Sequence, residues 1–147
     1  MYQKVKEMVD TIYPQLIAIR RDLHQHPELG LEEYRTSALV LDYLQQWNIK
    51  VTQLIGETAI VGLIEGNPGE KTIGLRADMD ALWQEVDGQM CANHSCGHDG
   101  HMTMGIGVLL LLKQLNKQLN GAVRVIFQPA EEKGGGALKV IEQGVVD

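Results

Sequence analysis

The chain has 147 residues, of which 44% are hydrophobic and 22% charged, and this is enough apolar material for one packed domain rather than a disordered segment. Thirteen Lys and Arg residues against nineteen Asp and Glu residues give a formal net charge of -6, and the chain has no basic block. This balance argues against nucleic acid and anionic membranes as partners. The longest apolar run, residues 102–112, is interrupted by Thr103 and two glycines. It is shorter than the roughly 20 residues of a membrane span and is typical of a buried helix.

The two cysteines, Cys91 and Cys96, occur in an acidic chain whose first residues lack an apolar signal core. Such cysteine usage indicates a reducing compartment, in which thiols serve metal binding or catalysis rather than disulfide formation. We therefore expect a cytoplasmic enzyme domain.

The hydrophobic periodicity changes along the chain from helical to strand-like and back. Helical spacing predicts a first helix over residues 5–23, in which Pro14 causes either a kink or the start of a second helix near Tyr13. Periodicity, β-branched runs and turn residues predict the remaining elements in this order: a helix over about 31–47, strands over 49–55, 58–66 and 71–78, a loop after Asp80, a glycine-rich helix over about 98–119, a strand over 121–128 and a helix over about 135–142. This order predicts an α/β fold, a three-layer α/β/α sandwich with a mixed, largely parallel sheet.

Residues suited to chemistry follow two of the predicted strands. Active sites of open α/β sheets lie at the carboxyl ends of strands, and here Asp78 and Asp80 follow one strand while Glu131 and Glu132 follow another. Between them, residues 94–101 hold three histidines, one cysteine and one aspartate, and cysteine and histidine are preferred ligands of zinc and similar ions. The sequence therefore predicts carboxylates, a thiol and imidazoles at one rim of the sheet.

Plainer interpretations of these residues remain open. The histidine cluster is also consistent with a helix N-terminus that is capped by Asp99 and carries exposed histidines. A closed structural zinc site fits less well, because it needs four ligands and the chain has no second ligand pair. Glu131 and Glu132 alone are typical of a solvated turn. Beside Cys96 and His98 they suit metal-assisted hydrolysis, in which one carboxylate binds the ion and its neighbour accepts a proton from water.

Asp78 and Asp80 allow two interpretations of their own. Paired carboxylates can act as the acid and base of a glycosidase, but such a pair needs no metal cluster beside it. A supporting role fits better, in which a carboxylate accepts the ring N–H of a ligating histidine. His24 and His26 lie just before Pro27 in a turn, where we expect capping or packing.

Four motifs in register resemble one family of enzymes. They are LHQHPELGLEE at 23–33, RADMDAL at 76–82, NHSCGHDGHM at 93–102 and FQPAEE at 127–132. In this order and spacing they resemble the amidohydrolase branch of the aminoacylase and carboxypeptidase metallopeptidases, which includes hippurate hydrolase and the auxin-conjugate hydrolases. The resemblance implies hydrolysis of N-acyl amino acids, acyl conjugates or small peptides by metal-activated water. It also implies two divalent ions, manganese or zinc.

Carried onto this chain, the resemblance implies a role for each motif residue. Cys96, His98 and Glu132 correspond to metal ligands, and Glu131 corresponds to the general base. Asp80 matches a carboxylate that supports a metal ligand from behind and belongs with Glu131 to the catalytic set. Asp78 stands where other branches of the family carry a ligating histidine.

The sequence departs from the family pattern in its length and near Trp83, which replaces a customary proline in a shortened loop. Members of the family are more than twice as long, with a dimerising lid domain and two further ligating histidines. We therefore expect residues 1–147 to be the N-terminal portion of a catalytic domain, without the lid and the C-terminal part, and a homodimer is an open expectation for the longer protein. The alternatives are a non-catalytic remnant that binds metal weakly, and Cys96 as a thiol nucleophile activated by a nearby histidine.

Overall fold

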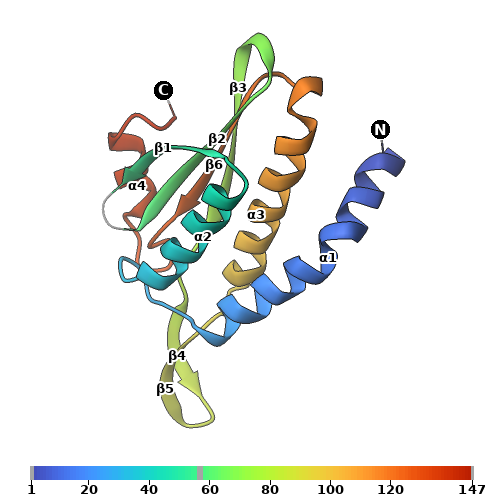
Figure 1. Ribbon diagram of the computed structural model, residues 1–147. Coiled ribbons are helices and arrows are strands. Elements are labelled where there is room, and N and C mark those ends of the chain that lie inside the picture. The colour runs from blue at the N-terminus through green and yellow to red at the C-terminus, as the bar shows by residue number, and fades with distance from the viewer. Residues whose placement is uncertain (1, 56–57, 147) are drawn as a thin grey trace.

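The computed structural model describes residues 2–55 and 58–146, and it combines one sheet, four α-helices and a separate hairpin within these residues (Figure 1). In chain order the elements are α1 Tyr2–Gln25, α2 Tyr34–Gln46, β1 Lys50–Ile55, β2 Ala59–Glu65, β3 Asn67–Asp78, β4 Leu82–Val86, β5 Gln89–Asn93, α3 His98–Leu115, a short 3-10 helix Asn116–Gln118, β6 Asn120–Gln128 and α4 Gly136–Glu142. The predicted helices and strands are all present, with ends shifted by a few residues.

The first helix runs without a break through Pro14, so a second helix beginning near Tyr13 is wrong. The ring of Pro14 removes one backbone hydrogen bond, but the rest of α1 is long enough to keep the helix intact. Its apolar stripe reaches the core in its second half, where Leu16 packs against the core and Ile19 and Leu23 are buried. The part of α1 that matters for the centre of the fold is therefore its carboxyl-terminal end.

The main sheet has the strand order β1-β2-β6-β3 and is mixed, as expected. Only the β3–β6 pairing is parallel, because β1 pairs with β2 and β2 pairs with β6 in antiparallel fashion. The expectation of a largely parallel sheet is therefore corrected within the described residues. It came from the apolar character of the middle strands, and a mixed sheet that is covered on both faces produces the same pattern.

The connection from β2 to β3 passes beside the start of β6, which lies between these two strands. Gly66 makes this passage at close range: its N–H donates to the carbonyl of Gly121, and a Cβ atom on Gly66 would lie 2.6 Å from the carbonyl oxygen of Leu119. Such a distance is a hard clash, so the position requires glycine. The chain thereby reaches the far side of β6 within a few residues.

Helices cover both faces of the sheet, and this confirms a layered α/β fold. One face packs against α1, α2 and α3 through a core that includes the fully buried Leu44, Leu109 and Phe127. The other face carries a smaller cluster with Val61, Ile126 and Val140, the last of which belongs to α4 (Figure 1). The second helical layer is thus much thinner than the first.

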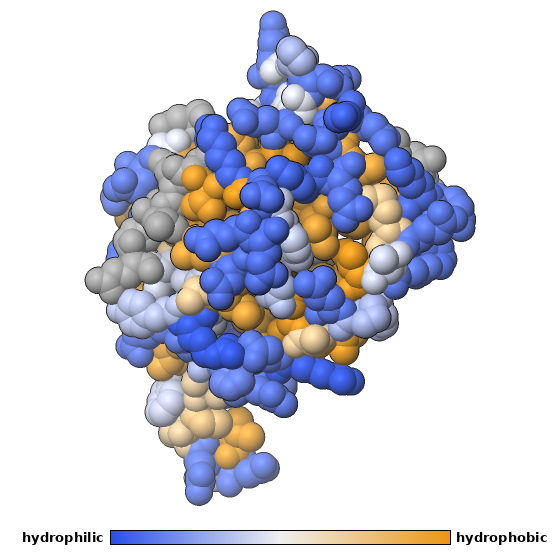
Figure 2. All heavy atoms as spheres, viewed as in Figure 1, coloured by the Kyte–Doolittle hydropathy of each residue, from blue (hydrophilic) through white to orange (hydrophobic). Residues whose placement is uncertain are grey.

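A β-hairpin stands where the sequence predicted a loop after Asp80. Strands β4 and β5 pair antiparallel through a two-residue turn at Asp87 and Gly88, both of which have positive φ angles of 51° and 81°. An Asp-Gly turn between two alternating segments is a strong hairpin signal, and it was overlooked in the sequence. The hairpin projects from the body of the molecule, with apolar colouring along its length and a hydrophilic tip (Figures 1 and 2).

Among the described residues, no helix is both long and apolar enough to cross a membrane.

Truncation of a core leucine tests the position of the core. Leu109 is 0% exposed on α3, so Leu109→Ala should lower the free energy of unfolding by about 2–5 kcal/mol through lost burial and the cavity that remains. Leu138 on α4 is 57% exposed, and Leu138→Ala should change it by less than about 0.5 kcal/mol. Urea denaturation of the two variants and the parent measures both values. Equal losses would contradict this core.

Candidate metal centre

Three segments that are far apart in the sequence meet at one edge of the sheet because β3 and β6 are parallel neighbours. The last pair in their register is Asp78 opposite Gln128, and the N–H of Met79 donates to the carbonyl of Gln128 over 2.9 Å. The residues that follow both strands therefore leave the sheet side by side. The amino-terminal end of α3 lies at the same edge, where the ring Nδ1 of His101 accepts the N–H of Asp78 over 3.2 Å.

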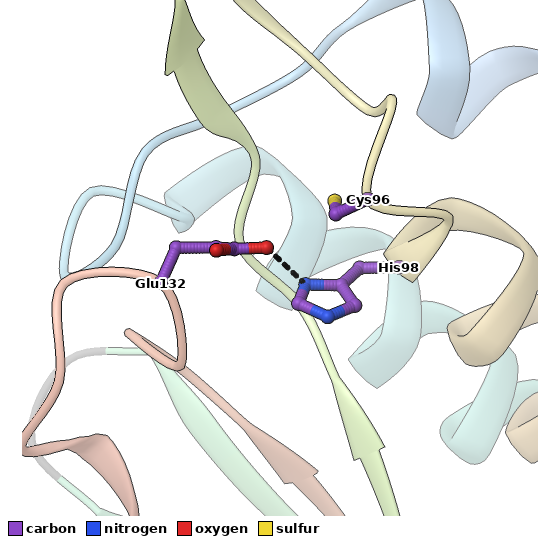
Figure 3. A group of neighbouring side chains, drawn as sticks. All are labelled: Cys96, His98 and Glu132. Atoms are coloured by element: carbon purple, nitrogen blue, oxygen red, sulfur yellow. Dashed lines mark ion pairs between the residues drawn. The ribbon is translucent and has the colours of Figure 1, made fainter.

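Cys96, His98 and Glu132 come together at this edge, as the sequence predicted. One ligand-type atom from each of the three side chains lies within 4.8 Å of the others. Cys96 lies in the turn just before α3, His98 is the first residue of α3, and Glu132 approaches from the loop after β6 (Figure 3). A thiol, an imidazole and a carboxylate at this separation are a donor set that suits a divalent ion such as zinc.

The imidazole of His98 is oriented by a main-chain contact. Its Nδ1 lies 2.9 Å from the carbonyl oxygen of Asp80, and a carbonyl only accepts hydrogen bonds, so the ring proton sits on Nδ1. Nε2 then carries the lone pair of the ring, and Oε1 of Glu132 lies 4.0 Å from Nδ1 (Figure 3). The carboxylate of Asp80 is farther from the ring, with Oδ1 3.6 Å from Nδ1. The main-chain oxygen of Asp80 thus makes the contact that was expected of its carboxylate.

The carboxylate of Asp80 instead holds the loop after β6. It is 0% exposed, and its two oxygens accept the backbone N–H groups of Glu131 over 3.0 Å and Glu132 over 2.9 Å. Burial of a carboxylate is costly unless hydrogen bonds replace its water, and these two N–H groups do so. Asp80 thereby ties both glutamates to the strand end that also orients His98.

Burial raises the pKa of the Cys96 thiol, and the neighbouring carboxylates of Glu132 and Asp80 add to this effect. The thiol lies 3.7 Å from the carbonyl oxygen of Asp80, to which it can donate weakly. His94 lies beside it, with Nδ1 3.9 Å from the sulfur, and burial lowers the pKa of this imidazole. Without an ion, the pocket therefore favours a neutral thiol and a neutral imidazole.

Glu131 lies on the open side of the group. Its Oε2 is 3.9 Å from Nε2 of His98, and its side chain is exposed to solvent. It is therefore close to the candidate ligands and free to move a proton. Its backbone N–H is fixed by Asp80, so the base of the side chain stays in place while the carboxylate remains accessible.

Asp78 is buried but takes part in a different set of contacts. Its Oδ2 forms an ion pair with Arg76 over 3.0 Å and lies 3.4 Å from Nδ1 of His101. Asp78 is not in the group of candidate ligands that the described residues form. The alternative of a glycosidase-type pair with Asp80 loses support, because the carboxylate of Asp80 is already bonded to two backbone N–H groups.

Asp99 is not the N-cap residue of α3, but its Oδ1 accepts the N–H of Gly100 in the first helical turn over 2.7 Å, so the plainer interpretation of the cluster holds for this one contact. The N-cap residue is Gly97, with a φ of 88°, and the buried carboxylate of Asp99 contacts Nδ1 of His24 over 2.7 Å and Nε of Arg20 over 3.1 Å. His24 thus has the packing role expected of it, and the contact ties α1 to the residue next to His98.

Glu33 was missed by the sequence analysis, although the structure places it next to the loop after β6. It is fully buried, and its Oε1 accepts the N–H of Ala130 over 2.9 Å. Its only signal in the sequence was its place at the end of the motif LHQHPELGLEE at 23–33, where it follows another glutamate. A pattern of residue types gives no information on which of two neighbouring glutamates points inward.

Comparisons with known proteins identify related enzymes. The model of peptidase family M20/M25/M40 matches residues 74–147. The chain is 44% identical to thermostable carboxypeptidase 2 of Saccharolobus solfataricus over 100% of this chain and 40% of that protein. It is 43% identical to hippurate hydrolase of Campylobacter jejuni over 88% of this chain and 35% of that protein.

A solved structure supports the same relationship. A Bacillus subtilis protein described as a dinuclear metal-binding peptidase of the M20 family superposes with a TM-score of 0.86 at 37% identity, covering 94% of this chain and 41% of that one. The chain thus spans between about a third and two fifths of the length of these relatives.

Zinc binding should depend on pH because the Cys96 thiol must lose its proton to bind an ion. Its raised pKa means that protons compete with zinc at neutral pH, so the affinity for Zn²⁺ should fall by about tenfold per pH unit as the pH is lowered. Isothermal titration calorimetry in buffers of different ionisation enthalpy measures both the affinity and the protons released. An affinity that is independent of pH, with no proton release, would argue against Cys96 as a ligand.

Proposed function

Because the chain belongs to peptidase family M20/M25/M40, we propose that it is the metal-binding part of a hydrolase that cleaves the amide bond of N-acyl amino acids or small peptides. The observation that carries this proposal is the group formed by Cys96, His98 and Glu132, with Glu131 beside it. The relatives are named as a carboxypeptidase and a hippurate hydrolase, and both names describe hydrolysis next to an amino acid.

Cys96, His98 and Glu132 would hold a divalent ion, with zinc favoured by the thiol and manganese as the alternative. When bound, such an ion supplies Lewis acidity, which lowers the pKa of water and polarises a carbonyl group. A second ion is part of the proposal, and the Bacillus subtilis relative is described as dinuclear. The described residues form one group of three candidate ligands, so further ligands for a second ion would come from other parts of a longer protein.

Glu131 would act as the general base and then as the general acid. Its exposed carboxylate next to His98 can accept a proton from the attacking water and return it to the leaving nitrogen of the amide. The backbone N–H contact with Asp80 holds the start of this side chain in place during both transfers. Asp80 would therefore act by positioning Glu131, which is consistent with the expectation that Asp80 belongs to the catalytic set.

We also propose that the chain is the first portion of a larger catalytic domain, and the exposed edge of β3 supports this. Among the described strands, β3 pairs only with β6. Ile73 on β3 is 60% exposed on the face that α3 covers, and a cavity of about 310 Å³ lies on the other face between Arg76, Val140 and Ile141. Apolar side chains on both faces of a free edge fit a further strand with helices on either side of it.

Location and partners belong to the same proposal. Cys91 and Cys96 are both free thiols, which fits a cytoplasmic protein. We propose a small-molecule substrate as the partner, and we expect neither nucleic acid nor a membrane as a partner. A homodimer stays an expectation for the longer protein.

Glu131→Gln in the longer protein should abolish hydrolysis of N-acetyl and N-benzoyl amino acids while the metal content persists, because the amide cannot accept the proton. Glu132→Gln is the matched control and should lower the metal content instead. Turnover assays combined with metal analysis separate the two outcomes. Near-normal hydrolysis by the Glu131→Gln variant would exclude it as the base. Activity that survives chelators would favour Cys96 as a nucleophile.

The free edge of β3 should make the 147-residue chain associate with itself, because exposed strand edges with apolar side chains pair with one another. Ile73→Lys places a charge on this edge and should shift the chain towards monomer in sedimentation velocity experiments. Zinc binding should stay unchanged, since Ile73 is not among the candidate ligands. A parent chain that is monomeric at all concentrations would argue against an unfinished edge.

A further inference from the structure

Glu33 carries a carboxylate that is buried from solvent and lies next to the loop of the candidate metal centre. It lies at the start of α2, is 0% exposed, and one of its two carboxylate oxygens has no hydrogen-bond partner among the described residues. Such a group is costly to bury, and the fold keeps it in place of an apolar residue that would fill the same space. The free-energy cost of burying this carboxylate indicates that Glu33 does more than fill space in the core.

The position of Glu33 in the helix makes its side-chain direction unusual. It is the N-cap residue of α2, the position from which a short polar side chain commonly accepts the free N–H groups of the first helical turn, but the side chain of Glu33 makes no such bond. Here Glu28 accepts them instead, from Arg35 over 3.0 Å and from Thr36 over 2.7 Å. Because Glu28 caps the helix, the side chain of Glu33 is free to turn inward.

Glu33 and Asp80 together bind three consecutive backbone N–H groups. Glu33 accepts the N–H of Ala130, and Asp80 accepts those of Glu131 and Glu132. Ala130 has a φ of 51°, a left-handed conformation that is unfavourable for a residue with a side chain. The contact with Glu33 therefore supports the strained residue at which the loop turns towards the candidate ligands.

The segment that carries Glu33 is itself pressed against this loop. A Cβ atom on Gly30 would lie 2.8 Å from Cα of Ala130 and 3.1 Å from Oδ2 of Asp80. The carbonyl of Glu28 also accepts the N–H of Ala81, the residue after Asp80, over 2.8 Å. Residues 28–33 thus contact both segments that build the candidate metal centre.

We propose that Glu33 is a positioning residue for the metal centre, because it fixes the backbone of Ala130 and thereby the direction of the Glu131 and Glu132 side chains. The inference rests on the proposed function, since it assigns Glu132 to the ion and Glu131 to the proton. Without the acceptor on Glu33, Ala130 can relax to an ordinary backbone conformation. Glu132 would then lose its alignment with Cys96 and His98.

Two substitutions of similar size test this role in the 147-residue chain. Glu33→Met fills the buried space but removes the acceptor, whereas Glu33→Gln keeps a carbonyl oxygen for the N–H of Ala130. We expect Glu33→Met to weaken Zn²⁺ binding by about 10- to 100-fold in calorimetric titration, and Glu33→Gln to restore most of the affinity. Glu142→Gln on α4 is the matched surface control, because Glu142 is exposed and lies outside the segments that build the candidate metal centre.

Two further measurements separate a positioning role from general stabilisation. Co²⁺ bound to the chain should show an altered visible spectrum in the Glu33→Met variant, because the geometry of the donor atoms changes. Amide hydrogen exchange should speed up at Ala130, Glu131 and Glu132 in this variant while the amide of Val125 in β6 keeps its protection. A folded Glu33→Met variant with unchanged Zn²⁺ affinity and unchanged exchange at these three amides would overturn the inference.

The same experiments distinguish failure of this inference from failure of the proposed function. If the parent chain binds neither Zn²⁺ nor Co²⁺, the proposal of a metal site is rejected. The hydrogen exchange of the three amides then still decides whether Glu33 fixes the loop. If the parent chain binds the ions and Glu33→Met binds them equally well, the proposed function stands and the role of Glu33 is rejected.

Discussion

The parallel pairing of β3 with β6 is the constraint on which the rest of the molecule depends. With Asp78 opposite Gln128, both strands end at the same level, and the two acidic segments that follow them lie beside one another. A slip of one residue would turn alternate side chains to the opposite face and separate Asp80 from the loop that it holds. The antiparallel part of the sheet and the three larger helices pack around β3 and β6 and hold these two strands in this register.

Buried carboxylates bonded to backbone N–H groups then carry the arrangement from the sheet to the loop. Asp80 and Glu33 both lie where water cannot reach them, and together they replace the hydrogen bonds that a loop of this kind would otherwise make with solvent. Such contacts have fixed geometry, unlike the packing of apolar side chains, and charged acceptors make them strong. The candidate ligands can therefore stay close together before an ion arrives, which lowers the cost of binding it.

Much of this was predictable from the sequence, and the exceptions have physical reasons. Periodicity identified the helices and main strands, residue chemistry brought Cys96, His98, Glu131 and Glu132 together as candidates, and the resemblance to a family divided them into ligands and a base. Strand direction was harder, since an apolar strand covered on both faces looks the same in parallel and antiparallel pairings. The inward turn of Glu33 could not be predicted, because it depends on Glu28 as the substitute cap, which is a contact between side chain and backbone that leaves no periodic signal.

The β4–β5 hairpin connects Asp80 to the histidine cluster but contributes little to the core, since Trp83, Val86 and Met90 are all exposed. Its two strands are held to each other by their own ladder, so changes at the Asp87–Gly88 tip stop within the hairpin. The segment can therefore gain or lose residues without moving the strand end on one side or the helix start on the other. It is the natural point at which the surroundings of the site can diversify, and the natural place to insert a tag or a reporter peptide that must stay close to the site without disturbing it.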